Sequence, residues 1–149
     1  MNINNTAQIS ADIVKIGALG TQGVLTINSG AQISANDQVK LFGGFGANGA
    51  VQFRGSGTMN ILSPNTVMRA TTIDVESNLT VNTGKNNSTD TLRIYSNNRQ
   101  FNTLGKGNIT LNGDSVGNAD INNTNVTVQE RDFSGTPNPA PNFDALPSL

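Results

Sequence analysis

Apolar and polar residues alternate along most of this chain, so that apolar side chains recur at every second position. The 3.6-residue period of an amphipathic helix is almost absent. Successive side chains of a strand point to opposite faces of a sheet, so a period of two indicates strands with one buried face. The pattern predicts an all-β protein with strands of about four or five residues. The apolar pairs are Val14 and Ile16, Leu25 and Ile27, Val39 and Leu41, Val51 and Phe53, Met59 and Ile61, Ile73 and Val75, Leu79 and Val81, Leu92 and Ile94, Ile109 and Leu111, and Val126 and Val128.

Short segments rich in Asn and Gly separate these runs. Examples are Asn28-Ser29-Gly30, Asn82-Thr83-Gly84 and Asn112-Gly113. Asn and Gly adopt positive φ angles at low cost, which tight turns require. The chain is therefore expected to turn sharply between one short strand and the next.

The chain also contains an internal repeat. The segment from Ala7 to Gly30 aligns with the segment from Ala31 to Gly57, and a diverged third copy follows. A repeat of about 20 to 28 residues with three short strands and no helix predicts the coils of a parallel β-helix. A β-sandwich is the alternative, because many alternating strands would also satisfy that fold. In the alignment Ile9, Val14, Ile16, Leu25 and Ile27 fall on Ile33, Val39, Leu41, Val51 and Phe53, and the third copy places Ile61, Val67, Ile73 and Val75 at corresponding positions.

The carboxyl-terminal segment departs from the repeat. Residues 1–130 are expected to form the β-helix, in about six coils, and residues 131–149 an irregular tail. Proline removes a backbone donor and is tolerated only outside a sheet or at its edge. The tail is either a disordered end or a cap in which Phe133, Phe143 and Leu146 cover the last coil. Its prolines are Pro137, Pro139, Pro141 and Pro147.

The amino-acid composition excludes several kinds of catalytic site, metal site and partner. The chain has no Cys, His or Trp, which excludes thiolate and imidazole nucleophiles, zinc sites built from those ligands, and disulfides. Nine Lys and Arg residues against ten Asp and Glu residues give a net charge of -1, which cannot neutralise a run of phosphates. We therefore expect no nucleic-acid partner, no membrane insertion, no metal, no cofactor and no enzymatic activity.

The segment from Gly17 to Val67 resembles the repeat region of filamentous-haemagglutinin-like exoproteins, which are large bacterial surface proteins. The motifs that carry the resemblance are VLTINSG, KLFGGFGANGAVQFRG and ILSPNTV, in that order, and NPAPNFDALPSL is similar to the tail of that class. The resemblance implies a right-handed, single-stranded parallel β-helix. It also implies an extracellular or cell-surface location and adhesive or scaffolding work.

One charged patch is a candidate site. If Val51, Ile73, Leu92, Ile109 and Val126 form one inward column, the neighbouring outward positions bring together Arg54, Asp74, Glu76 and Arg93. Such a patch is either a carbohydrate site, with an acid pair and an arginine clamp, or a ladder of ion pairs between coils. The ladder is favoured, because Asp74 and Glu76 lie on one strand with no third carboxylate in register.

These observations predict a structural or adhesive β-solenoid segment of a bacterial surface or secreted protein. Its polar faces would meet glycans, a host surface or neighbouring copies, and open coil ends would allow end-to-end assembly into filaments by strand addition. The alternative is a polysaccharide-binding or polysaccharide-cleaving β-helix, similar to a tailspike or lyase, that uses the charged patch. A third possibility is a protein whose only work is assembly.

Overall fold

A computed structural model describes residues 1–44, 46–84, 91–95 and 107–116. Within these ranges all regular structure is β-strand, and no helix occurs that is long and apolar enough to cross a membrane. The strands are β1 (Asn2–Ile3), β2 (Gln8–Gly17), β3 (Val24–Asn28), β4 (Gln32–Phe42), β5 (Ala50–Arg54), β6 (Thr58–Leu62), β7 (Asn65–Arg69), β8 (Thr72–Val75), β9 (Asn78–Asn82), β10 (Thr91–Tyr95), β11 (Ile109–Leu111) and β12 (Asp114–Val116).

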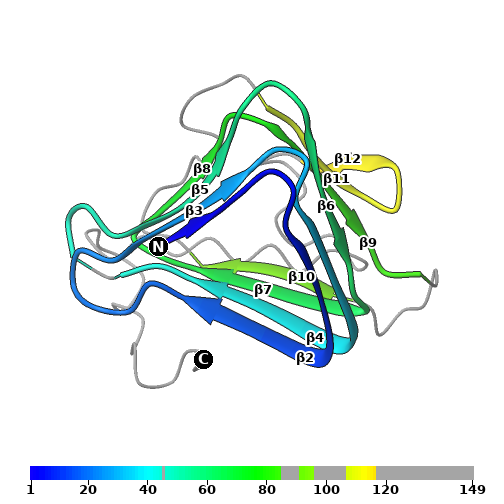
Figure 1. Ribbon diagram of the computed structural model, residues 1–149, viewed down its shortest axis with the longest axis horizontal. Coiled ribbons are helices and arrows are strands. Elements are labelled where there is room, and N and C mark those ends of the chain that lie inside the picture. Colours follow the sequence, from blue (N-terminus) through cyan, green and yellow to red (C-terminus); the bar gives the residue numbers. More distant parts are fainter. Residues whose placement is uncertain (45, 85–90, 96–106, 117–149) are drawn as a thin grey trace, which may run out of the picture.

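The strands wind into a three-sided β-solenoid (Figure 1). The first face stacks β1, β3, β5 and β8 in parallel, which corresponds to about three turns of the described chain. The second face contains the first halves of β2 and β4 with β6, β9 and β11. The third face contains the second halves of β2 and β4 with β7 and β10. The parallel pairing confirms the β-solenoid and is inconsistent with the antiparallel sheets of a sandwich.

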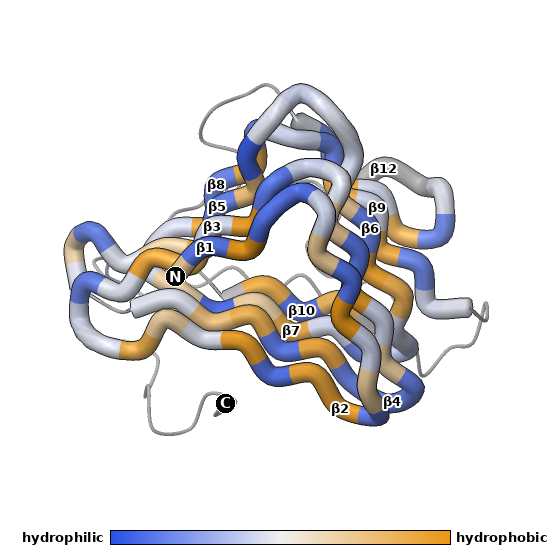
Figure 2. Tube along the Cα trace, viewed as in Figure 1, coloured by the Kyte–Doolittle hydropathy of each residue, from blue (hydrophilic) through white to orange (hydrophobic). Residues whose placement is uncertain are grey.

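Hydrophobic positions recur at matching places in successive turns (Figure 2), and their side chains form one buried core inside the solenoid. Ile3, Ile27, Phe53 and Val75 lie in register on the first face, and the last three are fully buried. The observed register confirms the five aligned pairs of the first two repeats, from Ile9 with Ile33 to Ile27 with Phe53. Each added layer therefore buries another ring of aliphatic side chains.

The alignment of the third repeat is wrong at one position. Val67 pairs with Lys40 rather than with Val39, so it lies on the outward side of β7. Thr66 and Met68 occupy the inward positions beneath Val39 and Leu41. Thr66 is fully buried although it is polar, so the rule that inward positions are apolar does not hold here.

The corners between faces depend on backbone conformations that glycine adopts easily. Gly30 follows β3 and has a φ of +97°. A Cβ atom there would lie 2.7 Å from the carbonyl oxygen of Asn5 in the neighbouring turn. The Asn28-Ser29-Gly30 turn was expected from the sequence, and the structure confirms it.

The parallel stack changes at β12, which runs antiparallel to β11. The expected six coils are not confirmed by the described residues, which make about three turns. Val126, Val128 and the proline-containing tail of residues 131–149 lie outside the described ranges.

Candidate functional site

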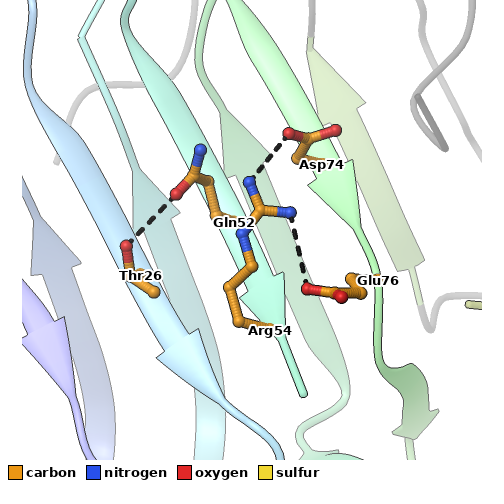
Figure 3. Close-up of polar contacts among 5 residues, drawn as sticks. All are labelled: Thr26, Gln52, Arg54, Asp74 and Glu76. Carbon is orange, nitrogen blue, oxygen red and sulfur yellow. Dashed lines mark hydrogen bonds and ion pairs between the residues drawn. The ribbon is translucent and has the colours of Figure 1, made fainter. Parts of the chain in front are cut away.

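A charged cluster lies on the outward side of the first face (Figure 3). Arg54 is the last residue of β5, Asp74 lies in β8, and Glu76 follows β8. The Arg54 Nη2 atom donates a hydrogen bond to Asp74 Oδ2 at 3.1 Å, and Arg54 Nη1 lies 3.9 Å from Glu76 Oε2. One guanidinium therefore joins two carboxylates of the neighbouring turn.

The cluster is half-buried. The side chains of Arg54, Asp74 and Glu76 are 25%, 13% and 33% exposed. Both carboxylates face the same cation, which offsets their mutual repulsion. On the same face the Thr26 hydroxyl donates to Gln52 Oε1 at 3.3 Å, so the polar contacts run down the sheet from turn to turn. The ion pairs of Arg54 with Asp74 and Glu76 thus join the turn of β5 to the turn of β8.

Arg93 does not belong to the cluster. It lies on β10 of the third face, where it pairs in register with Val67. The expected inward column is correct for Val51 with Ile73 but wrong for Leu92, which pairs with Thr66 on the third face. Ile109 likewise pairs with Leu79 on the second face. All three faces have the same alternation, so alternation alone could not assign these strands to a face.

Next to the cluster lies a polar hollow that the sequence analysis missed. Its volume is about 400 Å³, and its lining includes Asn2, Asn4, Asn5, Asn28 and Arg54. The Asn28 Nδ2 atom donates to Asn2 Oδ1 at 2.7 Å and to the carbonyl oxygen of Ile3 at 2.8 Å. The signal was the Asn-rich start of the chain, but using it requires knowing that residues 26 apart are neighbours.

The hollow offers side-chain amides, which both donate and accept hydrogen bonds, and the Arg54 guanidinium, which only donates them, so both kinds of group can bind hydroxyl groups. The described residues contain no group of three or more His, Cys, Asp and Glu side chains that could hold a metal ion. The chain matched no protein-family model, no curated protein and no solved structure.

Proposed function

We propose that this chain is a structural and adhesive β-solenoid segment of a bacterial surface or secreted protein of the filamentous-haemagglutinin-like kind. In this proposal the solenoid is right-handed, continues to about six coils, lies outside the cell or on its surface, and associates with itself end to end. One observation carries the proposal. Polar side chains on the outside of the solenoid form hydrogen bonds and ion pairs with polar side chains of the neighbouring turn.

These contacts recur around the solenoid. Besides the Arg54 cluster, they join Asn36 to Asp12 at 2.8 Å and the Thr80 and Thr110 hydroxyls at 3.4 Å. Side chains that bind their own neighbours stiffen the stack, because they hold adjacent turns in register as cross-strand pairs do. A stiff stack with polar faces suits a scaffold that displays a surface.

The adhesive part of the proposal rests on the polar hollow. Its amides are suited to the hydroxyl groups of a glycan, and Asn28 forms one wall. Asn28→Ala is expected to weaken binding of the whole chain to a glycan array or a host-cell surface. Asn36→Ala is the matched control, because Asn36 also bonds across turns but lies at another corner.

Electron microscopy of the purified chain over a hundredfold concentration range tests the structural part. Particles that lengthen with concentration at constant width would support end-to-end association. Compact particles at every concentration, together with no binding to glycans or cells, would contradict the proposed function.

Polysaccharide cleavage is the second candidate, favoured by the position of Asp74 and Glu76 beside Arg54, which lines the hollow. The double substitution Asp74→Asn and Glu76→Gln is the test, with circular dichroism to confirm folding. Turnover of a glycan by the natural chain that disappears in the folded double variant would establish the enzyme. Absence of turnover in both proteins would leave the scaffold as the function.

A further inference from the structure

At the N-terminal rim of the solenoid, formed by β1 and β2, one edge of the sheet has no partner among the described strands. Among the described strands β2 pairs only with β4, although it is ten residues long. The core residues of this layer retain some exposure, 4% for Val14 and 7% for Ile16, whereas Val39 and Leu41 beneath them are fully buried. An unpaired edge of this length is a template for another strand.

The hydrogen bonds to β4 show which peptide groups face the open edge. The Ala18 N–H donates to the Phe42 carbonyl, and the Ala7 carbonyl accepts from the Gln32 N–H, both at 2.9 Å. Because alternate residues of a strand direct their peptide groups to the same side, those of Lys15 and Gly17 face away from β4. By the same argument Gln8 and Ser10 also face the open edge.

We infer that two copies of this chain associate rim to rim, with β2 antiparallel to β2 of the second copy. The two-fold axis passes between Asp12 and Ile13, where β2 turns the corner from the second face to the third. Gln8 then lies opposite Gly17, and Ser10 lies opposite Lys15, so that edge-facing peptide groups meet. These are the pairs that exchange two hydrogen bonds in an antiparallel ladder.

The same register matches the two sides of the sheet. Ile9 lies opposite Ile16 and Ala11 opposite Val14, so residues that stack on the buried Ile33 and Ala35 meet residues that stack on the buried Val39 and Leu41. A shift by one residue would oppose inward and outward side chains and lose the match. The pattern of β2 is therefore self-complementary over its whole length, from Gln8 to Gly17.

The triangular cross-section also allows the two rims to pair along the first face, opposite the corner of β2. An axis through one corner of a three-sided section passes through the middle of the opposite face, which is the first face (Figure 1). There β1 meets β1 of the second copy, again antiparallel. The two-fold axis reverses the direction of the chain in the second copy, so the triangular rims of the two copies match along all three faces.

The column of lysines opposes a further parallel coil of the same kind. Lys15 already stacks in register on Lys40. Another parallel copy of this repeat would place a third lysine in that column, whereas the antiparallel register places Lys15 opposite the neutral Ser10. The antiparallel register also brings Asp12 of each copy next to the two-fold axis, where the hydrogen bond that Asp12 accepts from the Asn36 amide offsets part of the repulsion between the two carboxylates. The inference deepens the proposed end-to-end association and rests on it: the partner is a second copy, and at this rim assembly ends at a pair.

Sedimentation of the full chain over a wide concentration range, with Ser10→Glu and Ser10→Lys, tests the inference. Ser10→Glu places a carboxylate opposite Lys15 twice in the pair and is expected to tighten the dimer about three- to tenfold, while Ser10→Lys weakens it similarly. Ser34→Glu is the matched control, because Ser34 lies directly beneath Ser10 in the same sheet, away from the rim. Its dimer constant is expected to equal that of the natural chain.

A natural chain that stays monomeric throughout would overturn the inference, as would a dimer constant that Ser10→Glu and Ser10→Lys leave unchanged. Glycan or cell binding by such a chain would leave the adhesive proposal standing while the rim pairing failed. Growth into long rods that is insensitive to both substitutions would support end-to-end assembly through another surface and contradict pairing at this rim.

Discussion

Truncating an apolar side chain should lower the free energy of unfolding by an amount that depends on whether the residue lies in an inner layer of the solenoid or in its outermost layer. Ile27 is fully buried between Ile3 above and Phe53 below, whereas Ile3 lies in the outermost layer and is 6% exposed. Ile27→Ala removes three carbons, worth about 2.4 kcal/mol of burial, and the cavity adds about 1 to 2 kcal/mol. We expect a total of about 3.5 to 4.5 kcal/mol. Ile3→Ala is expected to cost about half of that, because neighbouring side chains and water can fill the open side.

Urea unfolding followed by far-ultraviolet circular dichroism measures both costs. The chain is kept dilute, so that no second copy covers the rim. The slope of the free energy of unfolding against urea has to stay constant between variants, since a changed slope signals that turns unfold separately. Equal costs at the two positions would refute the reasoning, because they would mean that the layer of Ile3 is covered as completely as that of Ile27.

The remaining predictions concern the exterior and the corners. Arg54→Ala removes the cation shared by two carboxylates and is expected to lower the free energy of unfolding by about 1 to 2 kcal/mol, whereas Arg93→Ala, outside the cluster, changes it by less than about 0.5 kcal/mol. Gly30→Ala is expected to cost at least about 1 kcal/mol more than Gly20→Ala in urea unfolding, since both have positive φ but only Gly30 has a backbone oxygen against it. Asn112, which has a φ of 50° and forms hydrogen bonds with Thr83 of the preceding turn, should tolerate Gly better than Ala, with thermal unfolding as the readout.

Alternation and repetition were sufficient to predict the strands and the first registers. The stacking of Ile9 on Ile33 and of Leu25 on Val51 follows from aligning two similar segments, because equal side chains occupy equal places in successive turns. The turn at Gly30 was also readable, since few residues other than Gly and Asn adopt a positive φ. Local chemistry and sequence similarity thus specify most of the described solenoid.

Assignment of strands to faces could not be predicted in the same way. The alternating pattern predicts Arg93 beside Asp74, because β10 and β8 alternate in the same way, yet these two strands lie on different faces. The face is decided by the number of residues at each corner, and these numbers vary from turn to turn. Between β2 and β4 the register shifts at the corner after Ala11. Such one-residue differences at a corner do not change the apolar–polar alternation within each strand, so the alternation cannot reveal them.

The identity of residues 8–11 with residues 32–35, which stack on one another, has a physical cost that bears on assembly. Gln8, Ile9, Ser10 and Ala11 stack in register on identical residues, as in a cross-β ladder, and such edges recruit further copies of themselves. One feature of β2 opposes open-ended growth by that route: the lysine column makes each added parallel copy less favourable. An antiparallel partner avoids the lysine column and matches the corner. A repeat that would otherwise extend without limit is therefore expected to stop at two copies on this rim.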